Sequence, residues 1–179
     1  MKTALLIIDV QQALCTGEHA AFQAGRVIDR INAVSRRARA AGAPVVVIQH
    51  EEADGSLRYG SPGWQLAAQL ECRPTDLYLR KTATDSFHRT ELHATLQGLA
   101  VEELVICGLQ SDFCVDTTTR RALALGYPVV LVADGHSTVD NGVLSAAQIT
   151  AHHNVTLSRI MSFGPRATAL AADDVKFGA

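Results

Sequence analysis

Short, unbroken runs of apolar residues recur along the chain, and each is bounded by polar residues or glycine. The first run, residues 3–8, ends abruptly at Asp9. Apolar runs without alternation are typical of strands that are buried on both faces, as in a parallel sheet. The same pattern predicts strands at residues 45–48, 77–79, 104–107 and 127–132, and a final edge strand at 156–160.

Amphipathic segments lie between these runs. In residues 24–41, Val27, Ile31, Val34 and Ala38 recur at spacings of three and four, which predicts a helix with one apolar face. Similar reasoning predicts helices at residues 91–99, 116–125 and 144–153, and a short helix near 167–172.

Five to six short strands that alternate with helices predict a three-layer α/β/α fold. Its core is expected to be a Rossmann-like, mostly parallel sheet with helices on both faces. The length of 179 residues predicts a single domain over residues 1–179. In such sheets, ligands bind beyond the carboxyl ends of the strands, near the point where the strand order switches.

Three reactive side chains follow predicted strands. Asp9 ends the first strand, Lys81 follows the third, and the fourth leads through a glycine turn to Cys114. Ser111 is a plausible N-cap, which places Cys114 about one turn into the next helix. There the free N–H groups and the helix dipole favour a thiolate and can hold an oxyanion. A single charge at a strand end often has no function, but the three together favour a functional site.

The composition argues against a nucleic-acid-binding, exported or membrane-spanning protein. The net charge is −2 and no basic stripe is present, so nucleic acid is not expected as a partner. The first apolar run is too short for a signal peptide, and no run reaches the roughly 18 residues of a membrane helix. The four cysteines show no metal-binding spacing, so reduced thiols and a cytoplasmic location are expected.

Several segments resemble the isochorismatase-like cysteine hydrolase superfamily. They are TALLIIDVQ at residues 3–11, RKTATDSF at 80–87, and GLQSDFCVDTTTRRALALGYPVVLVADGHST at 108–138. Two further segments, GSPGW at 60–64 and LSAAQITAHHNVTL at 144–157, resemble the branch described as nicotinamidase-related or general cysteine hydrolases.

The resemblance implies a catalytic triad of Asp9, Lys81 and Cys114. It also implies a cis peptide between Leu109 and Gln110, which turns the Gln110 N–H toward the Cys114 N–H to form an oxyanion hole. The expected activity is amidohydrolase cleavage of a C–N bond in a small molecule: Cys114 attacks as a thiolate, Asp9 transfers protons, and Lys81 holds Asp9. No cofactor is implied, and relatives form dimers or larger homo-oligomers.

The segment after the second strand departs from the metal-binding nicotinamidases. Those enzymes carry an Asp-x-His pair there, whereas this chain has Gln49-His50-Glu51-Glu52. His50 and Glu52 could in principle bind a metal, but polar side chains in a solvated loop are the simpler interpretation. We therefore expect no required metal, and nicotinamide becomes a doubtful substrate.

Trp64, Phe87 and Phe113 are predicted to line a substrate pocket. Trp64 is the only tryptophan and lies in a loop rich in glycine and proline, where a pocket or a subunit interface is favoured over the core. Phe87 and Phe113 lie near the predicted site, and a core position is equally compatible with their sequence context.

Two other functions stay open. An isochorismatase-type hydrolase of an enol ether does not need a cysteine nucleophile, so Cys114 argues for C–N cleavage instead. A non-catalytic binding protein that retains the fold has no need to keep Asp9, Lys81 and Cys114 together.

Overall fold

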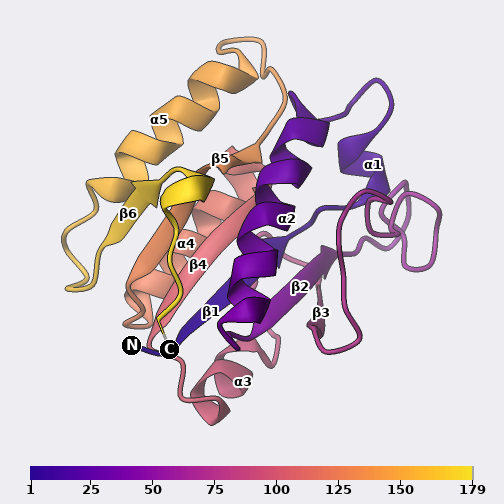
Figure 1. Ribbon diagram of the computed structural model, residues 1–179. Helices are drawn as coiled ribbons and strands as arrows, with labels where there is room; N and C mark the ends of the chain where they lie inside the picture. Colours follow the sequence, from indigo (N-terminus) through magenta and orange to yellow (C-terminus); the bar gives the residue numbers. More distant parts are fainter. Residues whose placement is uncertain (179) are drawn as a thin grey trace.

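The computed structural model describes residues 1–178 and is built on a six-stranded sheet (Figure 1). The strands are β1 (Thr3–Ile8), β2 (Val45–His50), β3 (Leu77–Lys81), β4 (Glu103–Leu109), β5 (Val129–Ser137) and β6 (Ala167–Leu170). They lie in the order β3-β2-β1-β4-β5-β6, and all the pairs are parallel. The predicted α/β fold with a parallel sheet is confirmed.

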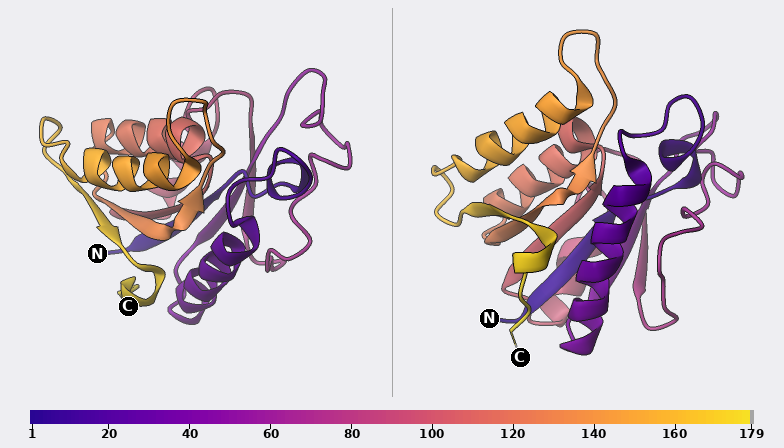
Figure 2. Two further views of the ribbon diagram at one scale, coloured as in Figure 1. Left: turned by 90° about the horizontal axis from the view of Figure 1, so that it is seen from above. Right: turned by 45° about the horizontal axis from the view of Figure 1, so that its top comes forward.

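Helices cover both faces of this sheet. They are α1 (Gln12–Cys15), α2 (Ala24–Ala40), α3 (Leu92–Gly98), α4 (Asp116–Ala124) and α5 (Ala146–Ser158). Figure 2 shows α4 and α5 on one face and α2 on the other. Successive side chains of a strand point to opposite faces, so Leu6 joins the core beneath α3, α4 and α5, while Leu5 and Ile7 join the core beneath α2. Because both faces of β1 are buried, its sequence is a continuous apolar run.

The strand order reverses between β1 and β4. From β1 the chain moves outward through β2 to β3, and it then returns to β4 and continues outward through β5 to β6. Gly108, near the end of β4, has a φ of +120°, and a Cβ there would lie 2.0 Å from the carbonyl oxygen of Ile8. Only glycine allows the two backbones to approach so closely at the switch point.

The predictions for the last third of the chain need correction. Residues 156–160 do not form a strand, because α5 continues through Ser158 and buries Leu157 completely. The edge strand is instead β6, where a short helix was expected, and a 3₁₀ turn follows at Ala172–Asp174. The β-branched pair Val155-Thr156 favours a strand locally, but burial of Leu157 against the sheet outweighs that weak preference.

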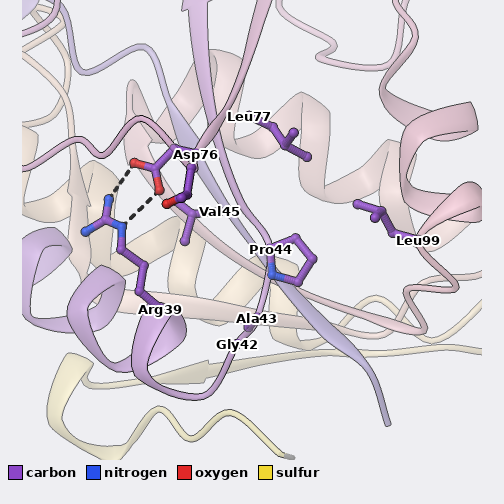
Figure 3. A pocket seen from close by; sticks show the side chains of 9 residues that line it. Arg39, Gly42, Ala43, Pro44, Val45, Asp76, Leu77 and Leu99 are labelled. Atoms are coloured by element: carbon purple, nitrogen blue, oxygen red, sulfur yellow. Dashed lines mark hydrogen bonds and ion pairs between the residues drawn. The ribbon is translucent and has the colours of Figure 1, made fainter.

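A pocket opens at the amino ends of β2 and β3, and Figure 3 shows it at close range. Its lining includes Arg39, Pro44, Asp76, Leu77 and Leu99. Arg39 and Asp76 form an ion pair at 2.8 Å in its wall. Since the strands run parallel, this pocket lies at the edge of the sheet opposite to Asp9 and Lys81.

Within residues 1–178, no helix combines the length and the apolar character that crossing a membrane requires.

Candidate active site

The carboxyl ends of β1, β3 and β4 bring three predicted site residues together. Asp9 directly follows β1, Lys81 is the last residue of β3, and Cys114 lies in the turn that follows β4. Lys81 pairs in register with His50 at the end of β2, and β2 pairs with β1. Parallel pairing therefore places these strand ends at one edge of the sheet, although they are far apart in the sequence.

Lys81 is the centre of this cluster. Its Nζ donates to Asp9 Oδ2 at 2.7 Å, to the carbonyl oxygen of Ala83 at 3.0 Å and to Cys114 Sγ at 3.2 Å. The side chains of Lys81 and Asp9 are 0% and 1% exposed, so water does not screen the ion pair. One ammonium group thus contacts both an acid and a thiol in a buried site.

The second carboxylate oxygen of Asp9 is free. Oδ1 is buried and has no hydrogen-bond partner among the described residues. The nearest ligand atoms of Asp9, His50 and Cys114 all lie within 4.8 Å of one another. A buried carboxylate that lies close to a thiol and has one unpaired oxygen is suited to accept the thiol proton.

The electrostatic surroundings favour a thiol at Cys114 in the resting protein, contrary to the thiolate expected from the helix position. Burial, with the Asp9 carboxylate as a second cause, raises the pKa of Cys114 to about 12, while the Lys81 ammonium acts in the opposite direction. The helix dipole is too weak to offset the loss of solvation beside a carboxylate. Ionisation of this sulfur therefore depends on a base that takes its proton.

The turn that carries Cys114 also differs from the predicted helix start. The peptide between Leu109 and Gln110 is cis, as expected, and residues Ser111–Val115 form a π-helical turn before α4. Gln110, not Ser111, occupies the N-cap position. Ser111 is buried, and its hydroxyl lies 2.8 Å from His136 Nδ1 instead of capping the helix.

His50 contacts the cluster, a relationship that the sequence did not predict. Its Nδ1 lies 3.3 Å from Lys81 Nζ, and its Nε2 lies 3.9 Å from a carboxylate oxygen of Glu52. Burial lowers the pKa of His50, and the Lys81 charge lowers it further. Lys81 Nζ lies within 3.3 Å of an atom of each of Asp9, His50 and Cys114. The ammonium occupies the space between these potential metal ligands, so they do not fit a metal ion with Lys81 in place.

The sequence placed Gln11 beside the predicted site but gave it no role. It is fully buried and links the ends of β1 and β2 to the loop that contains Trp64. Its amide nitrogen donates to the carbonyl oxygens of His50 and Trp64, and its amide oxygen accepts from the His50 N–H, each at 2.9 Å. Its position three residues after the first strand was a signal, but its partners depend on the tertiary fold.

The three predicted pocket aromatics have different environments. Phe113 is 51% exposed next to Cys114. Trp64 is half-buried and packs edge-on against Tyr59, with ring centroids 4.8 Å apart. Phe87 is buried and stacks on Tyr127, so it lies in the core, the alternative that the sequence had left open.

Comparisons with known proteins identify relatives of this chain. Streptothricin hydrolase from Streptomyces noursei is 44% identical over 138 residues, which cover 76% of this chain and 50% of that protein. The chain spans about half the length of the streptothricin hydrolases that it matches.

Solved structures extend the likeness to nearly the whole chain. An isochorismatase family protein has a TM-score of 0.86 and 38% identity, covering 95% of this chain and 98% of its own. N-carbamoylsarcosine amidase from Thermoplasma acidophilum has a TM-score of 0.81 and 25% identity, covering 98% of this chain and 99% of its own. The isochorismatase domain family matches residues 3–160. This chain therefore belongs to the isochorismatase family.

Proposed function

We propose that this protein hydrolyses a C–N bond of amide type in a small molecule, through an acyl-enzyme on Cys114. The observation that carries the proposal is the buried ammonium of Lys81, which contacts both Asp9 Oδ2 and Cys114 Sγ. Two similar proteins are named as a streptothricin hydrolase and an N-carbamoylsarcosine amidase, and the amidase name supports the same class of reaction.

In the first step, the sulfur of Cys114 attacks the amide carbonyl carbon while its proton moves to Asp9 Oδ1. A C–S bond forms, and the carbonyl π electrons move to oxygen. The backbone N–H groups of Gln110 and Cys114 are proposed to hold this oxyanion, and each such donor is worth about 3–4 kcal/mol in comparable sites. Because Cys114 rests as a thiol, this proton transfer is part of the attack.

In the second step, the C–N bond breaks and Asp9 returns its proton to the leaving nitrogen. Water then attacks the thioester carbonyl and gives a proton to Asp9. The C–S bond breaks, the product leaves as an acid, and Asp9 restores the thiol of Cys114. Lys81 keeps its protons throughout and stabilises the negative charge as it moves between Asp9 and the sulfur.

Substitution of the nucleophile tests this mechanism. Streptothricin and N-carbamoylsarcosine are incubated with the protein, and their hydrolysis products are measured by mass spectrometry. We expect Cys114→Ala to lower kcat at least about 1,000-fold and Cys15→Ser, a half-buried cysteine outside the cluster, to leave it unchanged. Intact-protein mass spectra after an acid quench should show an acyl adduct on the unsubstituted protein and on Cys15→Ser, and none on Cys114→Ala.

Amide turnover that survives Cys114→Ala contradicts the proposed nucleophile. Isochorismate is the probe for the alternative enol-ether reaction, which should survive Cys114→Ala. If none of these compounds is turned over, the rate of Cys114 alkylation in Asp9→Asn, compared with that in the unsubstituted protein, tests the Asp9–Cys114 coupling without a substrate.

A further inference from the structure

An irregularity in β5 places a histidine directly beside the turn that carries Cys114. Ile106 of β4 pairs with Leu131 of β5, but Gly108 pairs with His136, so two steps along β4 match five along β5. The extra residues fold tightly, since a Cβ on Gly135 would lie 2.6 Å from a methyl carbon of Val132. The bulge places His136 opposite Gly108, and its side chain contacts Ser111, the first residue of the π turn.

His136 is 2% exposed, and both of its ring nitrogens have partners. Nδ1 lies 2.8 Å from the hydroxyl of Ser111, and Nε2 lies 2.9 Å from Asn154 Oδ1 on α5. The Ser111 hydroxyl is also 3.2 Å from the hydroxyl of Thr150, one turn earlier on α5. These contacts connect β5, α5 and the turn that carries Cys114.

The hydrogen bond from Asn154 to Ala133 determines which atoms donate and which accept in the other contacts. Asn154 Nδ2 donates to the carbonyl oxygen of Ala133 at 3.0 Å, so its Oδ1 faces His136 and can only accept. His136 Nε2 therefore carries the ring proton, and Nδ1 accepts from the Ser111 hydroxyl. Burial lowers the pKa of His136 to about 4, so the ring is neutral at neutral pH and Nδ1 keeps its lone pair.

A second hydrogen bond links the turn at Ser111–Val115 to the residues at the end of β5. The hydroxyl of Thr138, two residues after His136, donates to Asp112 Oδ1 at 2.6 Å. Ser111 and Asp112 are the first two residues of the π turn, and Cys114 is its fourth. The start of the turn is thus tied to the end of β5 through two consecutive residues.

We propose that His136 is a positioning residue for the nucleophile, acting through Ser111. By fixing the first residue of the π turn, it holds Cys114 Sγ against Lys81 and keeps the backbone N–H groups of the turn aimed at one point. This inference rests on the proposed function for its catalytic consequence, but the orientation of Cys114 can be measured without a substrate. Hydrogen bonds are directional, so the His136 ring fixes the orientation of the Ser111 side chain and of the turn. A hydrophobic contact at the same place would leave the turn free to rotate.

A double-mutant cycle tests the link between the two residues. Ser111→Ala removes the hydroxyl, His136→Phe keeps a ring without its nitrogens, and the double variant removes both partners. His136→Asn is the conservative variant, because its Oδ1 can take the place of Nδ1 as acceptor. Leu157→Ala is the matched control, since Leu157 is buried on α5 and belongs to none of these hydrogen bonds.

Two readouts separate positioning from general loss of stability, both measured where every variant is folded by circular dichroism. The first is the rate constant for iodoacetamide alkylation of Cys114, read by peptide mass spectrometry. The second is kcat and KM for the substrate found in the screen above. We expect Ser111→Ala and His136→Phe each to slow alkylation about 5-fold and to lower kcat about 10-fold, with KM changed less than about 3-fold.

The double variant should be no slower than the slower single variant, because both substitutions break the same link. His136→Asn should recover at least half of the loss, and Leu157→Ala should match the unsubstituted protein. Unchanged alkylation and kcat in Ser111→Ala overturn the proposal, even if His136→Phe fails to fold. Equal losses in Leu157→Ala overturn it as well, since they indicate a nonspecific effect.

The outcomes also separate this inference from the proposed function. If Cys114→Ala abolishes turnover while Ser111→Ala behaves normally, only the positioning role of His136 is wrong. If Cys114→Ala retains turnover, the proposed nucleophile is wrong, whereas the alkylation data still decide whether His136 positions Cys114.

Discussion

The ammonium nitrogen of Lys81 lies 2.7 Å from Asp9 Oδ2, and both side chains are removed from solvent. Each charge compensates the other for the hydration that it lost on folding. The pair joins the ends of β1 and β3, which are separated in the sheet by β2. It is therefore both a structural contact and the electrostatic centre of the candidate site.

Removal of one partner of this pair should be costly. Lys81→Met leaves the Asp9 carboxylate buried without compensation, and we expect the free energy of unfolding to fall by about 3–5 kcal/mol. The double variant Asp9→Asn/Lys81→Met should recover a large part of this loss, because no isolated charge remains. Urea unfolding followed by circular dichroism measures both, and a cost below about 1 kcal/mol for Lys81→Met contradicts the argument.

Alkylation and hydrolysis should respond in opposite directions to Asp9→Asn. Asn tolerates the positive φ of 52° at this position, so the backbone is expected to be kept. Loss of the carboxylate lowers the pKa of Cys114, because Asp9 is one of the groups that raise it. More thiolate is then present at a given pH, and iodoacetamide should react faster with Cys114.

Hydrolysis should be lost in the same variant, because the asparagine cannot accept a proton.

Cys114 of the unsubstituted protein should react with iodoacetamide slowly at pH 7 and faster as the pH rises, in line with its raised pKa. A variant in which alkylation slows together with hydrolysis speaks against Asp9 as the group that raises the Cys114 pKa.

Gly108→Ala should prevent folding, whereas Gly98→Ala should not. A Cβ at Gly108 would lie 2.0 Å from the backbone of Ile8, in a conformation with a φ of +120°. At Gly98, the last residue of α3, a Cβ would meet no atom from outside its own helix within 4 Å. We expect Gly98→Ala to raise the free energy of unfolding by up to about 1 kcal/mol. Soluble expression and thermal unfolding compare the two variants, and a folded Gly108→Ala protein refutes the close approach of β1 and β4.

Acid should destabilise the protein partly through His136. Its pKa in the folded state is about 4, below the ordinary value of 6.5, so between these values the unfolded state binds more protons. The contribution of His136 to stability is therefore fully present above about pH 6.5, and it is lost as the pH falls toward 4. The difference corresponds to about 3 kcal/mol.

Urea unfolding at pH 7 and pH 4 tests this contribution. His136→Asn should lose about 3 kcal/mol less between the two pH values than the unsubstituted protein does, since all other titrating groups are shared. Equal losses in the two proteins indicate that His136 does not titrate in this way.

Asp76→Ala should lower stability without affecting the candidate active site. Asp76 accepts two hydrogen bonds from Arg39, at 2.9 Å and 2.8 Å (Figure 3). It accepts a third from the backbone N–H of Arg73 at 2.8 Å. We expect a loss of about 2–4 kcal/mol, because the Arg39 side chain is only 16% exposed. The alkylation rate of Cys114 in the folded variant should equal that of the unsubstituted protein, because the pocket lies at the opposite edge of the sheet. A changed rate indicates coupling across the sheet.

The order of apolar runs and amphipathic segments by itself determined the fold class and the edge of the sheet at which Asp9, Lys81 and Cys114 meet. Two regularities made this possible: buried parallel strands are apolar on both faces, and parallel strands end at the same edge. The last third of the chain was harder to predict. Residues 155–158 and 167–170 have weak local preferences, and contacts with β5 and the core decided between helix and strand.

Only the tertiary structure determined the protonation state of Cys114 and the contacts that hold the site residues in place. The position of Cys114 in the sequence suggested a thiolate, but its burial next to Asp9 favours the thiol. The contacts of Lys81 with His50 and of Ser111 with His136 join residues 31 and 25 positions apart. Pairwise contacts of this kind depend on strand register, on the bulge in β5 and on the depth of burial, and none of these has a local signature in the sequence.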